Sequence, residues 1–115
     1  MSQATTKEAE ATRSIIDRSV RRVVEAADPV KVILFGSRVR GDAREDADID
    51  FLVVEREVRD AAQESARLRR VIGPVGVGVD VVVVDEAGFD KWSEAPGSTL
   101  YWAKREGRVL YPAGS

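Results

Sequence analysis

A Gly-Ser pair and two closely spaced aspartates are arranged so that they could hold a nucleotide and metal ions. Gly36 and Ser37 close the apolar run at residues 30–35, and Asp48 and Asp50 follow after ten intervening residues. Glycine adopts backbone angles that are closed to other residues and lets a ligand approach the main chain. Free N–H groups at the start of a helix attract anions. This segment therefore predicts a phosphate-binding turn.

Three aspartates are candidate metal ligands and catalytic residues. Because side chains alternate along a strand, Asp48 and Asp50 are expected to point the same way from a strand at residues 48–54. Asp80 interrupts the apolar run at residues 77–84, where a lone charge is costly unless it faces a cleft or an ion. Three carboxylates could hold two Mg²⁺ ions about 3.5–4 Å apart for in-line displacement at phosphorus. Asp80 would accept the proton of the attacking hydroxyl or hold the metal that acidifies it.

Two arginines directly after the Gly-Ser pair could add positive charge to the same site. Guanidinium groups match phosphate oxygens, so Arg38 and Arg40 join Gly36 and Ser37 as candidate nucleotide-binding residues. Simpler interpretations are an ordinary strand-to-helix turn capped by Ser37, exposed surface arginines, and a polar strand edge for the first two aspartates. For Asp80, the simpler interpretation is a partly exposed aspartate paired with an arginine.

The composition excludes several classes of chemistry. The chain has 115 residues, a net charge of −2, and neither cysteine nor histidine. Disulfides, thiol nucleophiles, zinc–thiolate sites and the commonest general base are therefore absent, whereas a carboxylate-and-magnesium mechanism needs none of them. The charge argues against a long nucleic-acid track. Without a bilayer-length apolar stretch or a signal-peptide core, we expect no membrane association and a cytoplasmic location.

Hydrophobic periodicity predicts an α/β chain in which helices and strands alternate. Helices are expected over about 9–27, 60–72, 86–93 and 98–106, and strands over 30–35, 48–54, 77–84 and, at an edge, 108–111. We expect a flexible N-terminus at residues 1–8 and a single domain at residues 9–112.

The spaced residues resemble the minimal nucleotidyltransferases, which are small members of the DNA-polymerase-β-like superfamily. The family pattern of Gly-Ser, ten residues, Asp-x-Asp and a later aspartate falls on Gly36, Ser37, Asp48, Asp50 and Asp80. The Arg-Val-Arg-Gly continuation and the C-terminal segment also look like the family, and the resemblance covers roughly residues 12–112. It implies a polymerase-β-like α/β fold, with a mixed β-sheet and helices on one face. It also implies dependence on two Mg²⁺ ions and transfer of a nucleoside monophosphate from ATP or another NTP.

The same resemblance implies a protein partner. Many minimal members are encoded beside a HEPN-type RNase toxin and act as its antitoxin, in some cases by adding AMP to a toxin tyrosine. The shortness of the chain fits an acceptor hydroxyl on another protein, in a homo- or hetero-oligomer. Two alternatives stay open: an antitoxin that binds NTP and neutralises its partner by complex formation alone, and the nucleotidyl-donating subunit of an enzyme that modifies small molecules such as antibiotics.

Strand alternation also predicts an aliphatic surface beside the aspartates. Its members share the face of the three aspartates: Leu52, Val54, Val82 and Val84. With helices on one side of the sheet, this surface would be thinly covered and would dock a protein partner. The aromatic residues Trp92, Tyr101 and Trp102 are expected to serve packing or this interface rather than base stacking.

Overall fold

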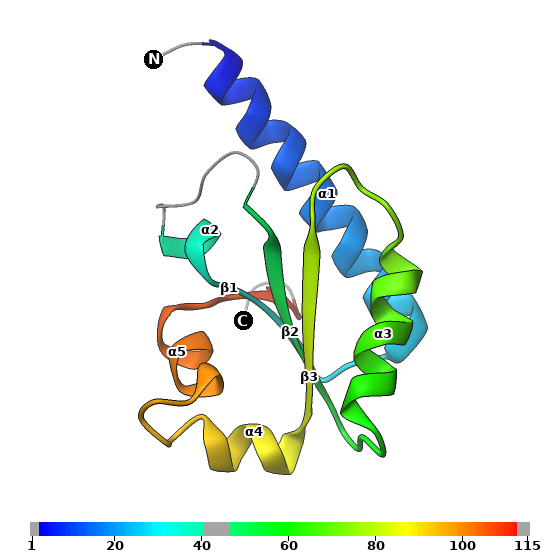
Figure 1. Cartoon of the computed structure of the whole chain (residues 1–115), viewed down its shortest axis with the longest axis vertical. Helices are drawn as coiled ribbons and strands as arrows, with labels where there is room; N and C mark the ends of the chain where they lie inside the picture. The colour runs from blue at the N-terminus through cyan, green and yellow to red at the C-terminus, as the bar shows by residue number, and fades with distance from the viewer. Residues whose placement is uncertain (1–2, 41–46, 113–115) are drawn as a thin grey trace.

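The computed structural model describes residues 3–40 and 47–112, in which helices and strands alternate (Figure 1). In chain order the elements are α1 (Gln3–Ala27), β1 (Lys31–Phe35), α2 (Ser37–Arg40), β2 (Ile49–Glu55), α3 (Ala61–Ile72), β3 (Val79–Asp85), α4 (Glu86–Trp92), α5 (Thr99–Glu106) and β4 (Arg108–Tyr111). None of the helices in these two ranges combines the length and hydropathy that a bilayer crossing requires.

The four strands form one mixed sheet in the order β3-β2-β1-β4. β1 is antiparallel to both β2 and β4, whereas β2 and β3 run parallel. A parallel pair needs a crossover connection, and α3 supplies it. The predicted mixed-sheet α/β fold is therefore confirmed, and the C-terminal strand lies at the edge as expected.

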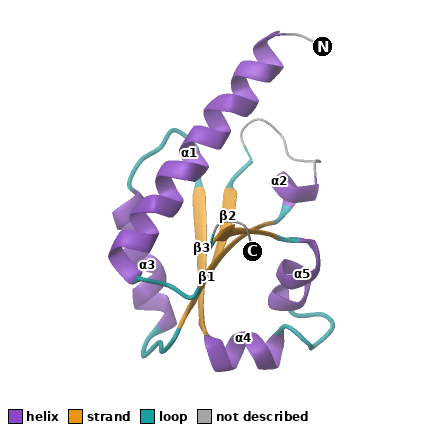
Figure 2. Ribbon diagram, turned by 180° about the vertical axis from the view of Figure 1, so that it is seen from behind, coloured by secondary structure: helices purple, strands orange, loops and turns teal. Residues whose placement is uncertain are grey.

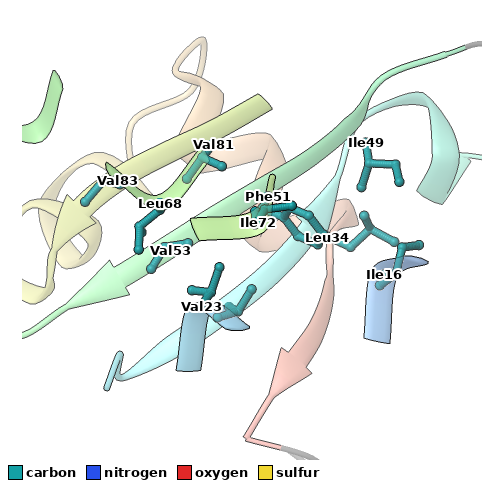
Figure 3. Packing of buried hydrophobic residues seen from close by; sticks show 11 residues of the cluster. Ile16, Val23, Leu34, Ile49, Phe51, Val53, Leu68, Ile72, Val81 and Val83 are labelled. Atoms are coloured by element: carbon teal, nitrogen blue, oxygen red, sulfur yellow. The ribbon is translucent and has the colours of Figure 1, made fainter. Parts of the chain in front are cut away.

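One face of the sheet is covered by the two long helices, α1 and α3, which lie side by side in both views (Figures 1 and 2). α1 contributes Ile16 and Val23, and α3 contributes Leu68 and Ile72. These side chains pack on alternate residues of β1, β2 and β3, as the period of two along a strand requires. The strand members of this core are Val32, Leu34, Ile49, Phe51, Val53, Val81 and Val83 (Figure 3).

The opposite face is partly covered by α4 and α5, so the expectation of helices on one face holds only for the long ones. Phe89 of α4 and Ala103 of α5 pack with Ile33, Leu52 and Val54 in a second core. Leu52 and Val54 are 0% and 2% exposed. The expectation of a thinly covered docking surface is therefore wrong for Leu52 and Val54, which the two short helices bury, whereas Val82 and Val84 are half-buried against the same core.

The long helix α1 begins earlier than expected. It starts at Gln3 instead of about residue 9. Residues 3–11 contain no glycine or proline and are rich in alanine and glutamate, which favour helix. The helix ends before Asp28, whose φ of 46° leaves the helical region.

Candidate active site

The strand order gathers two of the predicted aspartates into one row across the sheet. Asp50, near the start of β2, pairs with Phe35 at the end of β1 and with Asp80 near the start of β3. Paired residues on neighbouring strands project from the same face, and the strands lie about 4.8 Å apart. Phe35, Asp50 and Asp80 therefore follow one another on the face that carries α4 and α5.

The turn after β1 places a glycine directly against the Asp50 carboxylate. Gly36 has a φ of +86°, and Val39 N donates to its carbonyl oxygen at 3.1 Å. A Cβ added to Gly36 would overlap Asp50 Oδ2 and would lie 3.2 Å from Asp50 Cγ. Both the backbone angle and this close approach require glycine. Ser37 is the first residue of α2, so Gly36, rather than Ser37, occupies the position before the helix.

A second glycine makes room for Asp48, which lies exposed just before β2. A Cβ added to Gly78 would overlap Asp48 Oδ1 and would lie 2.8 Å from Asp48 Cγ. Ile49 N donates to the Gly78 carbonyl at 2.9 Å, which holds the two chain segments together. Gly78 was missed by sequence reasoning. The available signal was a glycine within an apolar run, which often marks a close approach of another group to the backbone.

Arg38 contacts the chain immediately before the aspartates. Its Nε and Nη2 both donate to the carbonyl oxygen of Ala47, the first at 3.1 Å. This forked contact holds the backbone that leads into Asp48, which is a positioning role. A phosphate-binding role for Arg38 stays a prediction, and so does that of Arg40, whose side chain lies outside the described residues.

Asp80 is accessible and weakly paired. Its side chain is 62% exposed, and its Oδ1 lies 4.0 Å from Nη1 of Arg69 on α3, which is 49% exposed. This is the pairing with an arginine that the simpler interpretation anticipated. An exposed pair at such a distance contributes well under about 1 kcal/mol, so the contact leaves Asp80 open to a ligand.

The three aspartates match a hard divalent cation in donor type. Such cations prefer carboxylate oxygens, and the row brings Asp50 next to Asp80 while Asp48 lies one position before β2. In residues 3–40 and 47–112, no three acidic side chains already form a metal-binding group. The arrangement is therefore an open carboxylate edge that suits magnesium in chemistry, rather than a closed cage.

A different acidic cluster lies at the far end of β2, beside a cavity of about 640 Å³. Burial, with the neighbouring Glu64 carboxylate, raises the pKa of Glu55 to about 7. Hydrogen bonds from Arg67 lower the pKa of Glu64 to about 2. Arg67 Nε and Nη2 each lie 2.8 Å from a Glu64 oxygen. This cluster neutralises its own charge, and nothing in the sequence pattern had singled it out.

Comparisons with known proteins agree with the fold. A crystal structure at 1.40 Å resolution of a provisionally assigned nucleotidyltransferase from Sulfolobus solfataricus aligns with a TM-score of 0.66 and 21% identity. The alignment covers 95% of this chain and 87% of that chain. At this identity it shows the fold alone. No curated protein sequence matches the chain significantly.

The family comparison carries more weight, because it matches most of the sequence. The model of the nucleotidyltransferase domain matches residues 16–101. That range contains the Gly36 turn, the Gly78 contact and all three aspartates. The predicted superfamily is thus confirmed at this level, and the chain belongs to the nucleotidyltransferase domain family.

Proposed function

We propose that this protein transfers a nucleoside monophosphate to a hydroxyl of a partner protein. The preferred version of the proposal is transfer of AMP from ATP. The observation that carries the proposal is the row that sets Asp50 and Asp80 beside the Gly36 turn. Family membership supports nucleotidyl transfer in general. Magnesium, ATP and a protein acceptor are the specific parts of the proposal.

Each site residue has a separate role in the proposed reaction. The backbone at Gly36 and the Ser37 hydroxyl approach the phosphates of the NTP. The acceptor oxygen forms a bond to the α-phosphorus while the bond from this phosphorus to the bridging oxygen breaks, and pyrophosphate leaves. The hydroxyl proton passes to the Asp80 carboxylate as general base. Magnesium bound at the carboxylates would neutralise phosphate charge and acidify the attacking hydroxyl.

The exposure of the carboxylate edge supports an acceptor on another molecule. Asp48 is exposed, and the Asp80 side chain is 62% exposed. A hydroxyl carried by a second protein can therefore reach this edge from solvent. The resemblance to minimal nucleotidyltransferases supports a HEPN-type RNase toxin as that protein, with this chain as its antitoxin in the cytoplasm, where NTP and Mg²⁺ are available.

The test is the intact mass of the co-expressed partner. With the wild type, we expect the partner to gain mass in AMP-sized steps, and Asp48→Asn with Asp50→Asn should abolish the gain. Asp17→Asn with Asp90→Asn is the matched control, because it removes the same charges from exposed positions on α1 and α4. Modification that persists in the Asp48 and Asp50 double variant would refute the site.

A second candidate is an NTP-binding antitoxin that neutralises its partner without catalysis. The observation behind it is that the third carboxylate, Asp80, already has a cationic neighbour in Arg69, although the contact is weak. In that case the wild type and the Asp48 and Asp50 double variant would inhibit the toxin equally, and the partner mass would not change. A third possibility is the nucleotidyl-donating subunit of a small-molecule-modifying enzyme. In an assay without the partner protein, such a subunit would transfer label from ATP to a candidate antibiotic, whereas neither antitoxin candidate would.

A further inference from the structure

A cavity of about 440 Å³ opens beside the carboxylate row, between the end of β1 and α5. It is lined by Phe35, Gly36, Thr99, Trp102 and Glu106. Phe35 is the row neighbour of Asp50. Gly36 also contacts the Asp50 carboxylate. One strand spacing of about 4.8 Å therefore separates the cavity wall from the reacting end of the site.

The cavity wall contains a large aromatic side chain that the protein leaves open to solvent. Trp102 is 52% exposed, although it belongs to a helix that is anchored on β1. Ala103, the next residue, is buried in the second core. Ser98 accepts a hydrogen bond from Tyr101 N at 3.1 Å and donates to the carbonyl of Trp92 at 2.7 Å, which fixes the start of α5.

The indole is also held by its neighbours along α5. The Tyr101 ring meets it edge to face, with centroids 5.2 Å apart and planes at 90°. The Arg105 guanidinium carbon lies 5.1 Å from the centroid of the Tyr101 ring. Such contacts are typical of positioned aromatic and cation–π pairs. Trp102 is therefore an oriented flat surface rather than a loose side chain.

The polar groups of the cavity complement this flat surface. Thr99, Trp102 and Glu106 are spaced so that they share one face of the helix. Threonine offers a hydroxyl that donates and accepts, and an ionised glutamate only accepts. A ligand pocket typically combines an apolar wall with a few such polar groups. A nucleobase has the matching shape, with a π-face for stacking and donors and acceptors at its edge.

We propose that this cavity is the nucleobase subsite of the NTP, with Trp102 as its stacking surface. The inference rests on the proposed function, which places the phosphates at Gly36, next to the cavity. Because the Glu106 carboxylate accepts hydrogen bonds, bases with an exocyclic amino group bind better than uracil. This assignment differs from the expectation that Trp102 serves packing or a protein interface, and the experiment below distinguishes the two.

The experiment compares a ligand that has a base with one that lacks it. Binding of ATP and of inorganic triphosphate, each with Mg²⁺, is measured by calorimetry for the wild type and Trp102→Ala. Stacking of one base on an aromatic side chain is worth about 1–3 kcal/mol. Trp102→Ala should therefore weaken ATP binding about 5- to 150-fold and leave triphosphate binding unchanged. Trp102→Phe, which keeps a ring, should restore part of the loss.

Trp92 provides the matched control. It is similarly exposed, at 48%, but lies on α4 outside the residues that line the cavity. Trp92→Ala should leave both affinities unchanged. The chain has two tryptophans, so Trp92→Phe makes Trp102 the sole indole reporter. ATP should then quench its fluorescence, whereas inorganic triphosphate should not.

The outcomes separate this inference from the proposed function. If the wild type and Trp102→Ala bind ATP equally well, the base subsite is refuted and nucleotidyl transfer stands. If Trp102→Ala weakens both ligands equally, Trp102 acts through the structure and the stacking assignment fails. If the wild type binds neither ATP nor triphosphate, both proposals fall. Loss of partner binding with unchanged ATP affinity would assign Trp102 to a protein interface instead.

Discussion

The two ends of β2 carry the same type of side chain in opposite environments. At its start, Asp48 and Asp50 lie against the backbones of Gly78 and Gly36. At its end, the Oε2 atom of Glu55 is buried and has no hydrogen-bond partner among the described residues. The first end opens to solvent beside Asp80, whereas the second faces Glu64 and Arg67.

The difference separates a structural carboxylate cluster from a candidate catalytic one. Arg67 is bound by both oxygens of Glu64 and also donates to the carbonyl of Ala26 at 3.3 Å, which ties α3 to the end of α1. The positive charge of Arg67 is therefore balanced by Glu64 of the same chain. The aspartate end instead has glycines that make space. The cavity at the Glu55 end is the larger of the two described, so cavity volume alone does not locate the chemistry.

The largest effect is expected when the space beside Asp50 is filled. Gly36→Ala should displace the carboxylate and slow nucleotidyl transfer about 100-fold, because small misplacements of catalytic groups have effects of this size. Gly97→Ala is the matched control. Its φ of +95° imposes a similar strain of about 1–2 kcal/mol, but among the described residues other than its chain neighbours no atom lies within 4 Å of the added Cβ. Equal transfer rates in the two variants would contradict the role of Gly36.

At the opposite end, removal of Arg67 should reduce stability and leave transfer intact. Arg67→Met deprives Glu64 of its two hydrogen bonds and leaves two adjacent carboxylates without a cation. We expect a loss of about 2 kcal/mol in the free energy of unfolding, measured in urea. Arg70→Met, at an exposed position of the same helix, should have little effect. A loss of transfer activity in folded Arg67→Met would make this end functional as well.

The pKa of Glu55 predicts a pH dependence of smaller size. The usual value of 4.5 is raised to about 7 in the folded protein, so the folded state holds a proton that the unfolded chain releases. The free energy of unfolding therefore falls as pH rises from 4.5 to about 7. The pKa of Glu64 is lowered from 4.5 to about 2, so its contribution to the free energy of unfolding is lost as the pH falls below 4.5.

Glu55→Gln should remove the loss of stability above pH 4.5. After allowance for the partial exposure of Glu55, we expect the free energy of unfolding of the variant to exceed that of the wild type by about 1 kcal/mol at about pH 8. At about pH 4.5 the two should differ little. Thermal unfolding across this range measures it. Glu57→Gln, at an exposed position that lines the same cavity, is the control. A gain that does not depend on pH would contradict the assigned titration.

The smallest effect is expected for the contact between Arg69 and Asp80. Because both side chains are about half exposed or more, Arg69→Ala should change the free energy of unfolding by no more than about 0.5 kcal/mol. Asp80→Asn should be equally mild for stability but should strongly reduce transfer. If Asp80→Asn also left transfer unchanged, the aspartate would be only a surface ion-pair partner, as the simpler interpretation holds.

Local sequence signals located most of the individual elements, although α1 begins earlier than they indicate. The β-branched run before Gly36 predicts β1, and in the structure the Asp60 and Ser98 side chains cap α3 and α5. The spacing of Gly36, Asp48 and Asp50 points to the nucleotidyltransferase family because these residues flank the single connection between two strands that are consecutive in the chain and paired in the sheet. These features involve residues close in the chain, whose preferences are set by backbone geometry and hydrogen bonding.

Other features depend on contacts between distant segments. The parallel pairing of β2 with β3 sets Asp80 beside Asp50, and the packing of α5 on β1 brings Trp102 to Gly36. Residue periodicity shows which side of each strand is apolar, but not which strand is its neighbour. It therefore identified the three aspartates but missed Gly78 and the aromatic cavity, because strand order and helix docking arise from the burial of both sheet faces at once.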